Sequence, residues 1–101
     1  MIKHVVFFRL KDEAEGHTKL ENALRIKGDL LRLLDVIPCL RSEEVGINIP
    51  NAENTDFDVC LECLFDTWAD LHTYATHPEH LKVAGFIGLC KSARSAVDYE
   101  I

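Results

Sequence analysis

The sequence has few basic residues and no basic run. Its 101 residues include 11 Lys and Arg against 17 Asp and Glu, which gives a formal net charge of -6 at pH 7. Proteins that bind nucleic acid or an anionic membrane present a cationic face to the phosphates. The charge balance therefore argues against both kinds of partner.

Long apolar runs are also missing. The N-terminal stretch VVFF is interrupted by Arg9 and Lys11, whereas a membrane-spanning helix needs about 20 consecutive apolar residues. The apolar segment of a secretory signal peptide is likewise longer than VVFF. We therefore expect a cytoplasmic protein without a membrane partner.

The four cysteines do not form the framework of a secreted, disulfide-rich domain, and only Cys60 and Cys63 lie close together in the sequence. A C-x-x-C spacing occurs in metal and redox sites. However, the segment DVCLECLF has strand character, and residues three apart on a strand point to opposite faces. We interpret all four cysteines as buried, small apolar side chains.

The composition, 48% hydrophobic and 28% charged, is that of a globular protein, and we expect a single domain over residues 1–101. Strand patterns occupy residues 2–11, 40–49, 57–66 and 92–101. Helical patterns occupy residues 18–36, 66–75 and 76–90. The order βαββααβ predicts a ferredoxin-like α+β fold, a four-stranded antiparallel sheet with all helices on one face.

The first strand is apolar on both of its faces. Val6 and Phe8 point to one side, and Val5 and Phe7 point to the other. Helices can cover only one face of such a sheet, and leaving the other in water costs about 25 cal/mol per Å². We therefore predict a homodimer in which a second copy covers the open face, sheet against sheet.

The stretch THPEH, residues 76–80, has the pattern of a helix start. Thr76 and Glu79 match a capping box, and Pro78 is favoured in the first helical turn. His77 and His80 are spaced like a pair of metal ligands on one helix face. Because Pro78 lies between them and no second ligand pair completes a tetrahedral site, we expect no metal.

Four segments together resemble one known family. The segments are MIKHVVFFRLKDEAEG, IPCLRSEEVGINI, FDTWADLHTYATHPEHLKV and the closing VDYEI. In order and spacing they are similar to the stress-responsive dimeric α/β-barrel family, also called the Dabb domain. The resemblance covers nearly the whole chain, and it implies a homodimer in which two ferredoxin-like sheets close into a dimeric α/β barrel.

The resemblance also implies a catalytic pair. Plant members similar to olivetolic acid cyclase close a linear polyketide by aldol condensation without metal or organic cofactor, using a tyrosine and the second histidine of an H-P-x-H motif. The matching residues here are Tyr74 and His80. A neutral imidazole can take a proton next to a carbonyl, while a phenol donates a hydrogen bond to the developing enolate.

The same resemblance implies a small-molecule pocket. Its expected lining residues are His4, Val6, Phe8, Ile26, Leu30 and His77. The polar groups of Tyr74 and His80 should reach into this pocket, roughly 3 to 7 Å apart. His77 is also explained by the turn alone. Because Ile26, Lys27 and Leu30 stand where the plant cyclases carry bulky aromatics, we do not expect a polyketide substrate.

Three functions remain open at this point. We favour a small-molecule-binding dimer with cofactor-free acid/base chemistry on a carbonyl compound, such as enolisation, aldol closure or a lyase step. The alternative is a non-catalytic stress or stabilisation protein of the same fold. The third is a relative of the cofactor-free monooxygenases, which share the fold but lack the HPEH element.

Overall fold

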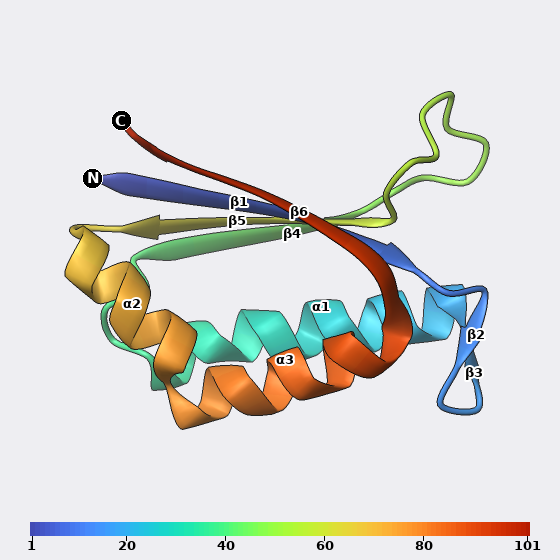
Figure 1. Ribbon diagram of the computed structural model, residues 1–101, viewed down its shortest axis with the longest axis horizontal. Coiled ribbons are helices and arrows are strands. Elements are labelled where there is room, and N and C mark those ends of the chain that lie inside the picture. Colours follow the sequence, from blue (N-terminus) through green and yellow to red (C-terminus); the bar gives the residue numbers. More distant parts are fainter.

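Four strands and three helices make up the main body of the computed structural model, which describes residues 1–101 (Figure 1). The sheet strands are β1 (Ile2–Leu10), β4 (Ser42–Ile47), β5 (Val59–Phe65) and β6 (Lys91–Glu100). The helices are α1 (Lys19–Val36), α2 (Trp68–Thr76) and α3 (Pro78–Cys90). None of these helices is both long enough and apolar enough to cross a bilayer.

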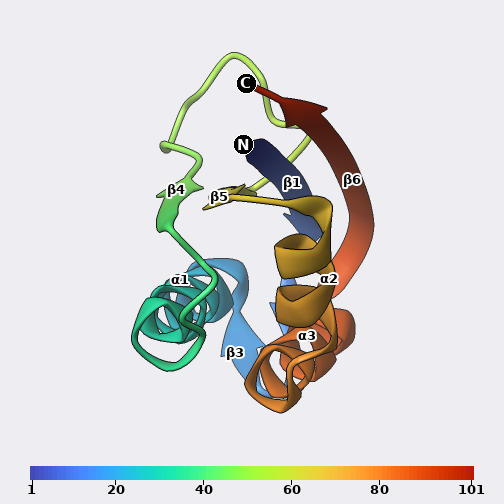
Figure 2. The same cartoon turned by 90° about the vertical axis from the view of Figure 1, so that its left-hand side faces the viewer.

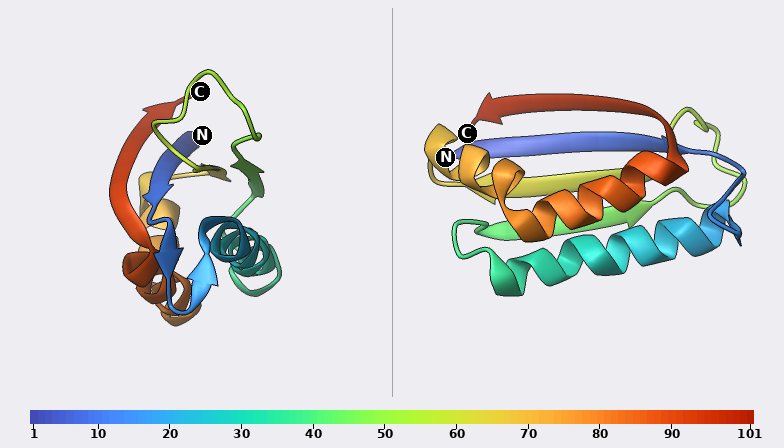
Figure 3. Two further views of the ribbon diagram at one scale, coloured as in Figure 1. Left: turned by 90° about the vertical axis from the view of Figure 1, so that its right-hand side faces the viewer. Right: turned by 60° about the horizontal axis from the view of Figure 1, so that its bottom comes forward.

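The four strands form one antiparallel sheet in the order β4-β5-β1-β6. All three helices lie on one face of this sheet, and α1 and α3 run side by side along it (Figure 2 and Figure 3). The ferredoxin-like α+β fold predicted from the sequence is confirmed.

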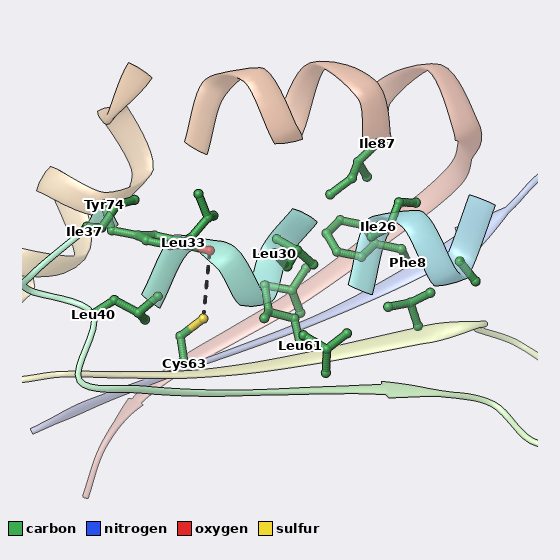
Figure 4. Close-up of a cluster of buried hydrophobic side chains, with 14 of the residues drawn as sticks. Phe8, Ile26, Leu30, Leu33, Ile37, Leu40, Leu61, Cys63, Tyr74 and Ile87 are labelled. Carbon is green, nitrogen blue, oxygen red and sulfur yellow. Dashed lines mark hydrogen bonds between the residues drawn. The ribbon is translucent and has the colours of Figure 1, made fainter. Parts of the chain in front are cut away.

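The core lies between the helices and the helix-facing side of the sheet. Directly opposed residues in the sheet share a face, so Val6 of β1 points the same way as its partner Leu61 of β5. The two helices that run along the sheet contribute Leu30 of α1 and Ile87 of α3 to the same cluster (Figure 4). These side chains are buried, and they form the apolar walls of the site described below.

A short hairpin between β1 and α1 was not anticipated from the sequence. It consists of β2 (Glu13–Ala14) and β3 (His17–Thr18). Its two turn residues, Glu15 and Gly16, both have positive φ angles, 52° and 79°, as a type I′ turn requires. The hairpin ends at Thr18, whose side chain caps α1 in a reciprocal capping box with Glu21.

The opposite face of the sheet carries no helix. Val5 and Phe7 of β1 lie there, only partly buried, and Val97 of β6 is 57% exposed. The loop between β4 and β5 projects on this side (Figure 1), and its Phe57 packs against Phe7 with the ring centroids 5.8 Å apart. This open face is therefore a large, partly apolar surface with an aromatic pair at one end.

The two cysteines of the C-x-x-C segment diverge as expected. Cys63 points into the core, whereas Cys60 lies on the open face of the sheet. Cys63 and Cys90 are buried, but Cys39 and Cys60 are only partly buried, so the expectation that all four are buried holds for two of them. Cys60 is partly accessible because no helix covers the open face, and Cys39 lies in the segment between α1 and β4.

A short chain of polar groups crosses the core from β4 to α2. The Cys63 sulfur lies 3.7 Å from Glu43 Oε2 and 3.9 Å from the Tyr74 hydroxyl, and Figure 4 shows the contact with Tyr74. The other oxygen of Glu43 has no hydrogen-bond partner. Because burial disfavours the charged carboxylate, it raises the pKa of Glu43 from 4.5 to about 7.

The titration of Glu43 predicts a pH dependence of stability. Between pH 4.5 and about 7 the folded protein keeps a proton that the unfolded chain has released. The free energy of unfolding therefore falls as the pH rises through this range. We expect the decrease in the free energy of unfolding between pH 4.5 and pH 8 to be smaller in Glu43→Gln than in the wild type, by about 1 to 3 kcal/mol. Urea denaturation at the two pH values measures this difference.

The exposed neighbour Glu44 provides a matched control. Glu44→Gln makes the same chemical change on the other face of β4, so it should leave the pH dependence of the wild type in place. Equal pH dependence of the wild type and Glu43→Gln would contradict the assignment.

Candidate functional site

A cavity of about 90 Å³ lies between the sheet and helices α1 and α3. Its apolar walls are formed by Val6, Phe8, Leu30, Leu61, Ala84 and Ile87. Its polar groups come from His4, His80, Lys91 and Arg94. The cavity thus combines an apolar body with two imidazoles and two cations.

A larger hollow of about 450 Å³ lies on the open face, between the β4–β5 loop and the sheet. Phe7, Phe57 and Cys60 are among its lining residues, but it contains no histidine or tyrosine. Size alone therefore does not identify the site, and the chemistry-bearing residues gather in the smaller cavity.

His80 owes its position to the break between α2 and α3. α2 continues through Thr76, whose hydroxyl donates a hydrogen bond to the carbonyl of His72 at 2.9 Å. His77 is then the extended N-cap of α3, and its Nδ1 accepts a hydrogen bond from the Glu79 amide at 3.1 Å. Pro78 occupies the first helical turn, as predicted.

The predicted capping box of Thr76 and Glu79 is therefore wrong. Because α2 runs one residue further than expected, Thr76 has helical rather than extended geometry, and the imidazole of His77 supplies the capping acceptor instead. His77 acts in the turn and does not line the cavity.

The hydrogen bonding of His80 defines its tautomer. Nδ1 lies 3.0 Å from the carbonyl oxygen of Ala75, and a carbonyl can only accept, so Nδ1 carries the proton. Nε2 therefore carries the lone pair. Burial lowers the pKa of His80 below its usual 6.5, and the nearby charges of His4 and Arg94 act in the same direction. A neutral imidazole is the dominant form at pH 7.

His4 is oriented by a carboxylate. It lies on the helix-facing side of β1, directly opposite Asp98 of β6, and its Nδ1 is hydrogen-bonded to the Asp98 carboxylate. The carboxylate can only accept, so Nδ1 is the donor and Nε2 is the remaining nitrogen. Both histidines thus have Nδ1 occupied by an oxygen acceptor.

Tyr74 packs against both imidazoles but does not line the cavity. Its ring centroid lies 4.4 Å from that of His80 and 6.4 Å from that of His4. The residue is 1% exposed, and its hydroxyl points to Cys63 rather than toward the cavity (Figure 4). The expected convergence of the phenol and His80 on one ligand is therefore not found, because the hydroxyl belongs to the polar chain with Glu43.

The cavity includes most of the expected residues and several that were missed. His4, Val6, Phe8, Leu30 and His80 line it as expected, whereas Ile26 is buried in the core away from it. Lys91 and Arg94 were missed, although the alternation of β6 places Arg94 opposite Phe8 and so on the helix-facing side. Lys27 lies elsewhere, beside Glu44 and Glu62.

The site can supply acid/base chemistry from its two histidines. His80 presents a neutral imidazole, and His4 presents an imidazole that is oriented by Asp98. No group of three or more His, Cys, Asp or Glu side chains is arranged to hold a metal ion.

Comparison with solved structures shows close similarity over the whole chain. A dimeric protein of unknown function with a ferredoxin-like fold from Bacteroides fragilis is 32% identical, with a TM-score of 0.79, covering 99% of this chain and 95% of that chain. No match was found among curated protein sequences.

Two more distant structures show the fold alone. A hydroxynitrile lyase from Passiflora edulis is 21% identical, with a TM-score of 0.78, covering 99% of this chain and 92% of that chain. An antibiotic biosynthesis monooxygenase is 11% identical, with a TM-score of 0.79, covering 100% of this chain and 98% of that chain.

The family assignment follows from the match to a whole-domain family model. The model of the stress responsive A/B barrel domain, Dabb, matches residues 2–101. This agrees with the sheet order, the helices on one face and the resemblance seen in the sequence segments. The chain belongs to the stress responsive A/B barrel domain (Dabb) family.

Proposed function

We propose that this protein is a small-molecule-binding homodimer whose cavity carries out cofactor-free acid/base chemistry on a carbonyl compound. The observation that carries the proposal is the state of His80. Its Nδ1–H is held by the Ala75 carbonyl, its pKa is lowered by burial, and its ring lines the cavity. A neutral imidazole with a free Nε2 in an apolar cavity is a suitable general base.

The proposed step is enolisation. His80 Nε2 takes a proton from the carbon next to the carbonyl, and the C–H bonding pair becomes the C=C bond of the enolate. The carbonyl π electrons move to the oxygen, which accepts a hydrogen bond from Nε2–H of protonated His4. The Asp98 carboxylate, paired with His4 Nδ1, balances the positive charge of that imidazolium.

Tyr74 has a positioning role in this scheme. Its ring packs against the rings of His80 and His4, and its hydroxyl is engaged at Cys63. A direct acid role, as the family resemblance implies, would need the hydroxyl to leave Cys63. These contacts support a scheme in which Tyr74 orients the two imidazoles and His4 donates the hydrogen bond to the carbonyl oxygen.

The fold of the protein is compatible with a lyase step after enolisation. A protein named as a hydroxynitrile lyase has this fold, so the architecture is compatible with a lyase reaction on a small molecule. The monooxygenase of the same fold keeps the third function open, but no observation at His4 or His80 favours oxygen chemistry.

The homodimer is supported by the open face of the sheet. Val5, Phe7 and Leu64 lie on that face only partly covered, and Tyr99 on β6 is 43% exposed. Burying such a surface against a second copy would stabilise the protein by about 25 cal/mol per Å² of apolar area. The Bacteroides fragilis relative, 32% identical, is described as dimeric.

The first test of the proposal concerns the dimer interface. Phe7→Glu places a charge on the open face, where a partner sheet would leave it buried and unpaired. We expect light scattering at micromolar concentration to give a dimer mass for the wild type and a monomer mass for the variant. Leu24→Glu, at a position 56% exposed on α1, should remain dimeric. A dimeric Phe7→Glu protein would show that another face forms the interface.

The second test concerns His80 as a base. Deuterium incorporation next to the carbonyl of a small ketone, followed by NMR in D₂O, measures enolisation directly. We expect His80→Gln to slow the protein-catalysed exchange at least about 100-fold, whereas His17→Gln in the exposed hairpin should not. Because the pKa of His80 is lowered from 6.5, the loss of rate on the acidic side should be centred below pH 6.5. An unchanged rate in His80→Gln would exclude it as the base.

A third test distinguishes ligand binding from the non-catalytic alternative, which the family's stress-responsive character favours. A ligand present at about 100 times its dissociation constant stabilises the folded state by about 2.7 kcal/mol. We expect at least one compound of a panel of small carbonyl compounds to raise the unfolding temperature. If no compound changes the unfolding temperature, the non-catalytic stress or stabilisation protein is favoured.

A further inference from the structure

The charge distribution around the cavity is not explained by its histidines alone. Lys91 and Arg94 of β6 both line the cavity, and no Asp or Glu side chain lines it. The cavity is therefore cationic in a chain whose net charge is -6.

These two cations also lack protein partners. The Lys and Arg ion pairs of the structure use Lys3, Lys19, Arg25, Arg32, Arg41 and Lys82. Lys91 and Arg94 are in none of them. Asp98, which also lies on the helix-facing side of β6, is paired with His4. The Arg94 guanidinium therefore keeps its planar set of donors free for an acceptor.

The size of the cavity limits what it can hold. A volume of about 90 Å³ is well below the roughly 300 to 1,000 Å³ of sites for drug-sized ligands. The six apolar lining residues favour a short carbon body rather than a sugar or a phosphate ester. A small organic anion has the size and the short carbon body that fit this cavity, together with a negative charge that can pair with Arg94.

We infer that the ligand is a short oxo-carboxylate, held by its carboxylate at Arg94 and Lys91 with its carbonyl between His4 and His80. A carboxylate matches the guanidinium in a bidentate geometry, and Lys91 adds a second positive charge. This inference rests on the proposed function, because it places the reacting carbonyl at the two histidines. It adds the substrate class that the histidines alone do not define.

Occupation of Arg94 also affects the base. The positive charge of Arg94 is one of the causes that lower the pKa of His80, after burial. A bound carboxylate offsets this charge, so the pKa of His80 should rise when the ligand binds. The ligand would thereby make the base stronger.

Pyruvate and pyruvamide are matched probes for this inference. They have the same shape and number of non-hydrogen atoms, and they differ in the charge at one end. We expect pyruvate to bind at least about tenfold more tightly than pyruvamide to the full chain, in a buffer free of phosphate and sulfate. Binding is measured from the NMR shifts of the His4 and His80 ring nuclei, which also report the rise in the pKa of His80.

The variant Arg94→Gln removes the charge at an exposed position, so the fold should be retained. We expect it to weaken pyruvate binding about tenfold while pyruvamide binding changes by less than about twofold. Lys27→Gln is the matched control, since Lys27 also lacks an ion pair but lies away from this cavity. It should bind both probes like the wild type.

The outcomes separate this inference from the proposed function. Equal binding of the two probes, no binding of either, or an Arg94→Gln variant that behaves like Lys27→Gln would overturn the carboxylate site. His80-dependent deuterium exchange into pyruvamide would still support the acid/base function in that case. Conversely, Arg94-dependent binding of pyruvate without any exchange would confirm the carboxylate site and contradict the acid/base function.

Discussion

The register of β1 between β5 and β6 governs both surfaces of this protein. Val6 faces the helices because it pairs with Leu61 and Ala96, and Phe7 faces away because it pairs with Cys60 and Ser95. A shift of one residue would exchange these faces, removing His4 from the cavity and Phe7 from the open face. The site and the proposed dimer interface are thus set by one strand alignment, on opposite sides of the same backbone.

The break between α2 and α3 connects that sheet to the site. Because the chain turns at His77, Tyr74 at the end of α2 inserts its phenol toward Cys63, while His80 in the first turn of α3 reaches the cavity. The two rings remain in contact at 4.4 Å. The turn thus places His77 at the cap of α3 and His80 at the cavity.

The polar character of the cavity comes largely from the edge strand. β6 pairs only with β1, and its helix-facing positions Arg94 and Asp98 lie where the helix layer leaves them accessible. Polar side chains can stay hydrated at such an edge while their ends reach the rim of the core. This explains how a small, mostly apolar cavity contains an oriented histidine and free cations without burying an unpaired charge.

The order of elements, the helix-facing residues of β1 and the divergence of Cys60 and Cys63 could all be predicted from the sequence, because strand alternation and turn residues act locally. The family followed from the resemblance of four segments. The sequence also pointed to His4 and His80 in one pocket, through the family resemblance. Three features became visible only in the folded protein: the direction of the Tyr74 hydroxyl, the capping of α3 by His77, and the position of Lys91 and Arg94 at the cavity. The first two features depend on where α2 ends, which a local pattern of polar and apolar residues does not define. Strand alternation places Arg94 on the helix-facing side, but its position at the cavity depends on the pairing of β6 with β1, which is distant in sequence.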